Sequence, residues 1–146
     1  MRKLLFLLPF LASCDPHWAM VGAPPASTVP AVPAMTSSPP VRTATTSSGQ
    51  PLKLPQGPAE MISARVVIPA GGATPIHQHP WSRFVYVEQG PIRVVNHDTG
   101  QSRDFPSGTV LPEVVAQWHE GRAIAGPVTL VVIDIVPPGA TNMVMR

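Results

Sequence analysis

From residue 60 onward, hydrophobic and polar residues alternate over short stretches. Met61 to Ile68 is rich in β-branched residues and ends at Pro69 and Gly71-Gly72, which predicts a strand followed by a turn. Further strands are predicted over 83–89, 92–97, 101–105, 109–111, 116–119 and 128–136. No apolar run has a clear 3.6-residue period. Short strands separated by Gly and Pro turns predict an all-β sandwich or barrel.

The last of these stretches differs from the others. Residues 128–133 are almost continuously apolar, which is typical of a strand with neighbours on both sides. Roughly ninety residues of predicted strands and turns are enough to enclose one hydrophobic core. We therefore expect a single folded domain over residues 59–146.

The first residues have the pattern of an export signal. Arg2 and Lys3 precede an apolar stretch, 4–11, that is too short to cross a bilayer as a helix. The following residues, Leu11-Ala12-Ser13-Cys14, are similar to the bacterial lipobox, in which the signal is removed before a cysteine that then carries lipid. This resemblance implies a lipoprotein signal peptide over 1–13 and a membrane anchor at Cys14. The alternative is an ordinary secretory signal with an incidental cysteine.

Residues 14–58 consist mainly of Pro, Ala, Ser and Thr. They have almost no charge and no apolar period, so they cannot bury enough surface to offset backbone entropy. We expect a disordered linker that holds the folded domain away from the bilayer. Asp15 follows the cysteine, and in enteric bacteria this residue is associated with retention at the inner membrane. The expected location is therefore the periplasmic side of the cell envelope.

Charge and composition exclude several classes of function. The chain has 10 Lys and Arg against 8 Asp and Glu. Loss of Arg2 and Lys3 with the leader leaves 8 of each sign (10 − 2 = 8), so the mature protein has no basic surplus for binding nucleic acid. The single cysteine excludes an internal disulfide. There is also no nucleophile elbow, phosphate loop, zinc ribbon or dinucleotide fingerprint.

Three histidines suggest a metal site. His77 and His79 are two residues apart on an extended segment, so their side chains point to the same side. His119 can return beside them only if the chain folds into a closed sheet. Three neutral imidazoles suit zinc, copper, iron and nickel and leave positions for water and substrate. Ordinary core or surface histidines are the alternative, and His97, beside a predicted turn, is expected to be solvated.

The spacing of glycines and histidines resembles the two motifs of the cupin superfamily. The resemblance covers about residues 59–137 and implies a cupin-type double-stranded β-helix, or jelly-roll barrel, with His77, His79 and His119 as metal ligands. Where the second motif usually has Pro, Gly and Asn, this chain has other residues. The matching positions are Gly71, His77, His79, Gly90, Gly108 and His119, and the departures in the second motif are Val114, Ala116 and Ala123.

Arg83 stands where the first motif usually has a glutamate ligand. An arginine remains protonated and does not bind a cation. In one reading, Arg83 faces the histidines and holds the carboxylate of a substrate by a bidentate contact, as a catalytic residue. In the other, Pro80 and Trp81 interrupt the strand and Arg83 turns outward into a surface ion pair.

Other side chains are weaker candidates for the site. Glu88 and Glu120 have the opposite strand parity and are expected to be solvated or paired, and Glu113 is weaker still as a ligand. Aromatic residues in a small β-domain are more often core than pocket lining. Methionines near the C-terminus could bind copper, but a mobile tail is the simpler account. The aromatic residues are Trp81, Phe84, Tyr86 and Trp118, and the methionines are Met143 and Met145.

Two classes of function follow. The first is an envelope-anchored metalloprotein that acts on a small, anionic molecule, with Arg83 steering the substrate. Resemblance to cupins and the three histidines favour iron(II) and dioxygenase-like chemistry, with zinc, manganese, nickel and copper also open. The second is a non-enzymatic periplasmic metal carrier or small-molecule sensor, and a third possibility is a degenerate cupin without metal. The resemblance also implies a homodimer formed through sheet edges.

Overall fold

The computed structural model describes residues 34–146, and the predicted signal peptide, Cys14 and much of the expected linker lie outside the described residues. Residues 40–146 form one compact unit. No helix among residues 34–146 is long and apolar enough to cross a membrane. The compact unit contains nine strands, namely β1 (Glu60–Ile68), β2 (His77–Gln78), β3 (Arg83–Gln89), β4 (Ile92–Asn96), β5 (Ser102–Phe105), β6 (Val110–Pro112), β7 (His119–Ala123), β8 (Val128–Val136) and β9 (Val144–Met145).

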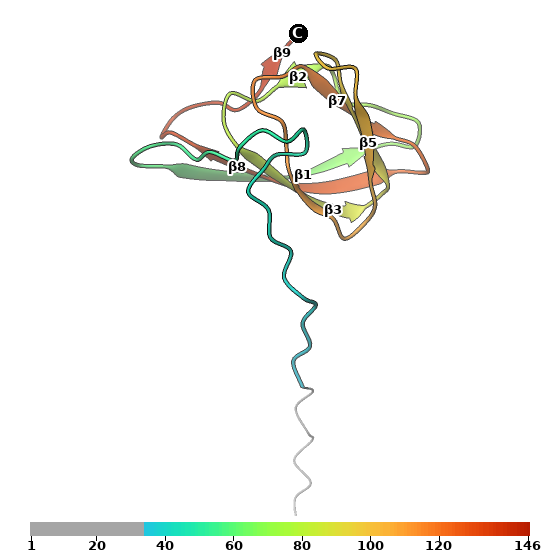
Figure 1. Ribbon diagram of the computed structural model, residues 1–146. Helices are drawn as coiled ribbons and strands as arrows, with labels where there is room; N and C mark the ends of the chain where they lie inside the picture. Colours follow the sequence, from blue (N-terminus) through green and yellow to red (C-terminus); the bar gives the residue numbers. More distant parts are fainter. Residues whose placement is uncertain (1–33) are drawn as a thin grey trace, which may run out of the picture. The chain divides into compact units, whose positions relative to one another are not determined.

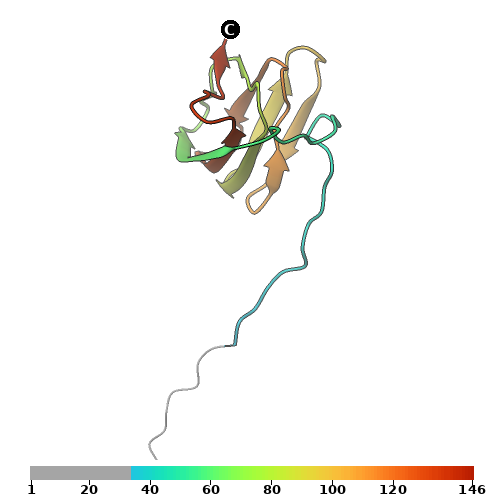
Figure 2. The same ribbon diagram turned by 90° about the vertical axis from the view of Figure 1, so that its left-hand side faces the viewer.

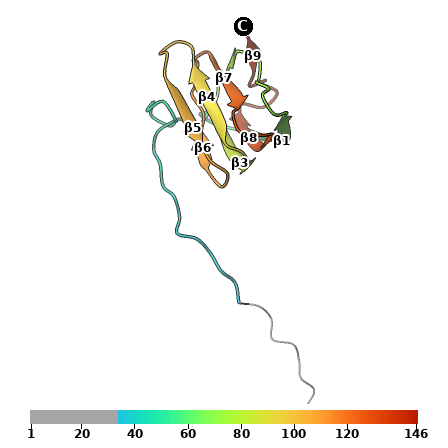
Figure 3. The ribbon, with the colours of Figure 1, turned by 90° about the vertical axis from the view of Figure 1, so that its right-hand side faces the viewer.

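The strands form two antiparallel sheets, as the prediction of an all-β fold required (Figures 1 and 3). One sheet has the order β1-β8-β3-β6 and the other the order β5-β4-β7-β2-β9. β8 lies between β1 and β3, which explains its almost continuous apolar sequence. The chain crosses between the two sheets several times, so strands distant in sequence become neighbours (Figure 2).

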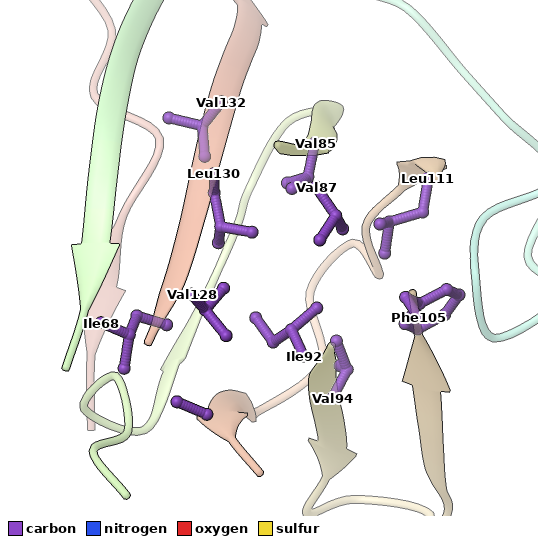
Figure 4. Close-up of a cluster of buried hydrophobic side chains, with 11 residues drawn as sticks. Ile68, Val85, Val87, Ile92, Val94, Phe105, Leu111, Val128, Leu130 and Val132 are labelled. Carbon is purple, nitrogen blue, oxygen red and sulfur yellow. The ribbon is translucent and has the colours of Figure 1, made fainter. Parts of the chain in front are cut away.

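The core lies between the two sheets (Figure 4). Alternate residues of each strand point into it, such as Val85 and Val87 on β3 and Ile92 and Val94 on β4. β8 contributes Val128, Leu130 and Val132 from the same sheet as β3, and these side chains face those of β4. Burial of these small branched side chains holds the two sheets together, and the polar site described below occupies other inward positions.

The C-terminal residues are part of a sheet, which differs from the expectation of a mobile tail. β9 pairs with β2, so that Met145 lies opposite His77 and Val144 opposite Gln78. The Arg146 N–H also donates to the Ile76 carbonyl over 3.1 Å. Backbone hydrogen bonds to β2 order this segment, and they leave no signal in its short sequence.

The folded unit begins earlier than the boundary expected at residue 59. Residues 44–53, which we call the strap, contact the domain although they were expected to belong to the linker. Within the strap, Thr45 pairs with Pro51, and Thr46 is buried. The Ser47 N–H donates to the Pro112 carbonyl over 2.8 Å. These contacts are mostly polar and backbone-directed, so a search for apolar periodicity could not find them.

Candidate metal centre

The three histidines singled out in the sequence come together inside the domain. His77 on β2 lies directly opposite His119 on β7, and His79 follows β2 by one residue. Their ring centroids are 4.5 to 5.0 Å apart. His79 and His119 are only 0% and 1% exposed. Closure of the second sheet between β7 and β2 therefore produces the cluster.

Each of these imidazoles is oriented by a backbone carbonyl. Nδ1 of His77 lies 2.7 Å from the Pro75 carbonyl oxygen. Nδ1 of His119 lies 2.8 Å from that of Gln117. Nδ1 of His79 lies 2.6 Å from that of Asn142. A carbonyl only accepts hydrogen bonds, so each Nδ1 carries the proton and each Nε2 keeps its lone pair. This arrangement is typical of metal-binding histidines.

Glu113 joins the histidines, contrary to its ranking as the weakest carboxylate. It follows β6 in the opposite sheet, and its Oε2 lies 2.9 Å from His79 Nε2 and 3.8 Å from His119 Nε2. The four residues each offer a ligand atom within 4.8 Å of the others. Sequence spacing could not identify Glu113, because only the folded barrel brings this loop to β2 and β7. The loss of glutamate at position 83 was the one signal for a replacement.

Two ring nitrogens in the cluster lack a hydrogen-bond partner. Nε2 of His79 and Nε2 of His119 are buried, and neither makes a hydrogen bond, although both lie near Glu113. A buried polar atom without a partner normally costs free energy. A cation between these nitrogens and the Glu113 carboxylate would satisfy all of them, so the donor set fits a divalent transition metal.

The electrostatics of the cluster prepare it for a cation. Burial and the neighbouring charges of His119 and His79 lower the pKa of His77 to about 4, so its imidazole is neutral. Burial alone would raise the pKa of Glu113, but contact with His119 and His79 lowers it well below its usual range. Burial opposes protonation of His119, yet Glu113 outweighs it and raises the pKa. Without an ion, therefore, a Glu113 carboxylate faces a readily protonated His119.

Arg83 lies on the inner face of β3 but binds another protein group. It pairs in register with Asp134 of β8, and its Nε and Nη2 donate to the two carboxylate oxygens, each over 2.7 Å. Both side chains are largely buried, at 11% and 7% exposed. The surface ion pair considered for Arg83 is thus wrong. Asp134 occupies the edge of the guanidinium formed by Nε and Nη2, so a bidentate contact to a substrate would have to use the other edge.

Asn142 connects the C-terminal segment to the site. Its carbonyl accepts from His79, its Nδ2 donates to Asp134 over 2.6 Å, and its Oδ1 accepts from the Trp81 N–H over 2.8 Å. Asn142 is itself buried. One residue therefore holds His79 and the partner of Arg83 in fixed relative positions.

Ala116 takes a backbone conformation that glycine usually supplies. Its φ is 53°, in the left-handed region, and its N–H donates to the His79 carbonyl over 2.9 Å. Cupins usually have glycine at this position, so the chain keeps the backbone turn of the second motif without its glycine. Such strained residues tend to occur at functional sites.

The remaining charged candidates lie in ion pairs. Glu88 pairs with Arg65 at the surface, as expected. Glu120 pairs with Arg122 over 2.6 Å and with His97 over 3.0 Å. His97 was expected to be solvated, and it is instead fixed by this carboxylate. None of these three groups belongs to the cluster.

The aromatic candidates are spread over the domain. Trp81 lines a cavity of about 850 Å³ beside the strap, and Tyr86 is 42% exposed. The guanidinium of Arg146 lies 5.9 Å from the centre of the Trp118 ring. The hydrophobic core contains none of Trp81, Phe84, Tyr86 and Trp118, so the expectation that these residues form the core is wrong.

Comparison with known proteins supports the fold. No protein-family model matches the chain, and no curated protein matches it. A cupin-like protein from Thermotoga maritima has a TM-score of 0.52 at 18% identity over 59% of this chain and 64% of its own. The polyketide cyclase RemF from Streptomyces resistomycificus has a TM-score of 0.50 at 19% identity, covering 65% and 68%.

The DMSP lyase DddQ from Ruegeria pomeroyi has a TM-score of 0.51 at 21% identity over 59% of this chain. This chain spans only 43% of the length of that lyase. A protein described by its double-stranded β-helix domain, from Klebsiella pneumoniae, has a TM-score of 0.50. The domain therefore has the cupin fold, and it carries a cluster of three histidines and one glutamate that could bind a metal ion.

Proposed function

We propose that the domain is a cupin metalloprotein that binds one divalent transition metal through His77, His79, His119 and Glu113 and acts on a small, anionic molecule. The observation that carries this proposal is the pair of buried Nε2 atoms, on His79 and His119, that face the Glu113 carboxylate without hydrogen bonds. Three Nδ1 atoms already bound to carbonyls make the Nε2 lone pairs the available ligands.

Four protein ligands restrict the chemistry. A six-coordinate ion such as iron or manganese would retain two positions for substrate and oxygen, whereas a tetrahedral zinc would retain none. Iron(II) is our first choice, because it would supply dioxygenase-like chemistry at this site, and zinc, manganese, nickel and copper follow. Cupin-fold neighbours with enzyme names, a lyase and a cyclase, support a catalytic role. Arg83 would contribute through its positive charge, which opposes protonation of His119.

A non-enzymatic metal carrier is the second candidate. It is favoured by the four ligands themselves, which would fill a tetrahedral ion, and by the burial of His79 and His119. An exchangeable water on the bound ion would contradict the carrier, and full occupation of the ion by protein ligands would contradict the enzyme. X-ray absorption spectroscopy of the ion with which the protein is purified counts its ligands and distinguishes the two: four protein ligands alone support the carrier, and additional water ligands support the enzyme.

Metal content tests the proposal directly. We expect elemental analysis of the purified protein to give about one metal ion per chain, and the variants His77→Ala and His119→Ala to lose it. The matched control is His97→Ala, because His97 pairs with Glu120 outside the cluster. A parent protein that remains folded but binds no metal under any loading condition would rule the proposal out.

We also propose that lipid on Cys14 holds the chain at the periplasmic side of the envelope, with Asp15 favouring the inner membrane. The support is the sequence 11–14 alone. Partition of the protein into a detergent phase should be lost in Cys14→Ser.

A homodimer is further supported by exposed apolar residues on the edge strand β1, where Met61 is 67% and Val67 is 58% exposed. Light scattering would test it.

A further inference from the structure

A cavity of about 430 Å³ with both polar and apolar walls lies between the strap and strands β4 and β5. Its volume is in the range of small-molecule sites. Val94, Phe105 and Val114 form its apolar part. The polar side chains that line it are hydroxyls, amides and one guanidinium, contributed by Ser47, Ser48, Asn96, Gln101, Ser102 and Arg103.

Arg103 is an exposed residue, but it lies on the side of β5 that also carries the core residue Phe105. It is two residues before Phe105, whose side chain is buried in the core, so both point to the same side of β5. In register, Arg103 lies opposite Val94, which is also a core residue. The Arg103 guanidinium stacks over the Phe105 ring at 5.2 Å. Stacking occupies a face of the guanidinium and leaves the N–H edge available for an anion.

This guanidinium has no acidic partner among residues 34–146. The other strand arginines all pair with carboxylates, namely Arg65 with Glu88, Arg83 with Asp134, Arg93 with Asp104 and Arg122 with Glu120. The neighbouring Asp104 has the opposite strand parity and is held by Arg93. An arginine that lines the cavity and has no carboxylate partner therefore distinguishes this cavity from the other charged positions on the strands.

The cavity also borders the metal centre. Asn96 lies directly opposite His119 in the register of β4 and β7. Val114, which lines the cavity, immediately follows Glu113. A molecule in the cavity would thus contact residues that lie next to two of the proposed metal ligands, His119 and Glu113.

We propose that this cavity binds a small hydroxylated carboxylate, with the Arg103 guanidinium on the carboxylate and the serine and glutamine side chains on the hydroxyls. The geometry suits both contacts, because a guanidinium edge binds carboxylate bidentately and neutral hydroxyls and amides complement alcohol groups. The inference rests on the proposed function, since it names the class of the anionic molecule and assigns its anchor to Arg103 in place of Arg83.

The test uses tartrate as the hydroxylated probe, succinate as the same carbon chain without hydroxyls, and inorganic phosphate as a simple anion. Titration calorimetry is carried out on the full chain, both metal-loaded and chelator-treated, with metal content measured on the same samples. We expect tartrate to bind in the millimolar range, about 10-fold tighter than succinate or phosphate. Arg103→Ala should weaken tartrate binding about 10-fold or more, and Arg103→Lys should weaken it less, because lysine lacks the bidentate edge.

Arg65→Ala is the matched control, since it removes the same charge from a surface pair with Glu88. It should bind tartrate as the parent does. Tartrate binding that survives Arg103→Ala in a protein with unchanged thermal unfolding overturns the inference, as does a parent that binds no tartrate or prefers phosphate. The two proposals fail separately. A chain that takes up no metal on loading but binds tartrate through Arg103 contradicts only the metal site. A chain that takes up metal but does not bind tartrate contradicts only the cavity.

Discussion

At the scale of single residues, the carboxylate of the cluster comes from Glu113 and not from position 83, where the cupin motif usually has a glutamate. Position 83 carries an arginine held by Asp134, and Glu113 supplies the carboxylate that faces His79 and His119. In both places, a buried charge lies beside a charge of the opposite sign or a site for one. The buried guanidinium has its own counter-ion, and the cluster has an anion to offset a divalent cation.

Glu113→Gln should lower the affinity for metal by more than about 100-fold, because even groups that only orient metal ligands are worth about 10- to 100-fold. Glu88→Gln is the control, since Glu88 carries the same charge in a surface pair with Arg65. Competition with a chromophoric chelator measures both affinities. Equal affinities in the two variants would remove Glu113 from the ligand set.

Metal binding should release protons in slightly acidic solution. Burial opposes protonation of His119, but contact with Glu113 outweighs it and raises the pKa, so the metal-free protein keeps a proton there to higher pH than a free imidazole would. His77, with a pKa of about 4, is already neutral. Zinc must displace the His119 proton, and the release falls as the pH rises through the raised pKa.

Calorimetry at pH 6.5 in two buffers of different ionisation enthalpy gives the number of protons released. We expect a measurable release of protons at pH 6.5 and a smaller release at pH 8.5. Binding enthalpies that do not depend on the buffer would show that His119 is neutral in the metal-free protein, in contradiction to its contact with Glu113.

At the scale of elements, the strap holds the loop that carries Glu113. The Gln50 side chain accepts from the Val115 N–H over 2.9 Å and donates to the Val115 carbonyl over 2.8 Å. The Ser47 N–H binds the Pro112 carbonyl on the other side of Glu113. The Glu113 N–H itself donates to the Arg83 carbonyl over 2.8 Å. The loop is therefore fixed at both ends and at its centre.

Gln50→Ala should lower metal affinity about 10-fold, because the loop loses both hydrogen bonds at Val115 and Glu113 is positioned less firmly. Gln56→Ala changes the same residue type in a nearby exposed position and is the control. Amide exchange at Val115 should also become faster in Gln50→Ala. The role of the strap would be refuted by unchanged exchange and unchanged affinity.

The pairing of β3 with β8 depends on a buried ion pair. Asp134→Ala would leave the Arg83 guanidinium uncompensated and should cost about 3 kcal/mol in the free energy of unfolding. The double variant Arg83→Met with Asp134→Leu should recover much of this loss, because two apolar side chains replace the pair. Denaturant unfolding measures both. A single variant as stable as the parent would mean that water or Asn142 compensates the arginine.

At the scale of the whole molecule, the folded unit extends across the boundary that composition indicates. The strap adds hydrogen bonds from Ser47 and Gln50, and the Lys53 carbonyl accepts from the Ser82 hydroxyl. A protein of residues 57–146 should therefore unfold at a temperature about 10 °C below that of residues 40–146, since the bonds are worth about 2 kcal/mol together. Calorimetry of the two proteins checks this, and equal midpoints would make the strap an incidental contact.

The sequence by itself determined the class of fold and most of the cluster. Strand periodicity and turn residues depend on local chemistry, so the all-β domain and the run of β8 as an inner strand were predictable. His77 and His79 share a side for the same local reason, and their spacing with His119 resembled a known motif. Strand parity also predicted that Glu88 and Glu120 lie outside the cluster, in ion pairs.

Only the tertiary structure decided which carboxylate completes the site and what Arg83 does. Glu113 and Asp134 lie 30 and 51 residues beyond Arg83 (113 − 83 = 30 and 134 − 83 = 51). Their contacts with the site exist only because two sheets bring β6 and β8 against β2, β3 and β7. The same holds for the strap and for β9, which are ordered by backbone hydrogen bonds to distant strands. Such bonds are open to almost any sequence, so residue types alone carry no record of where they form.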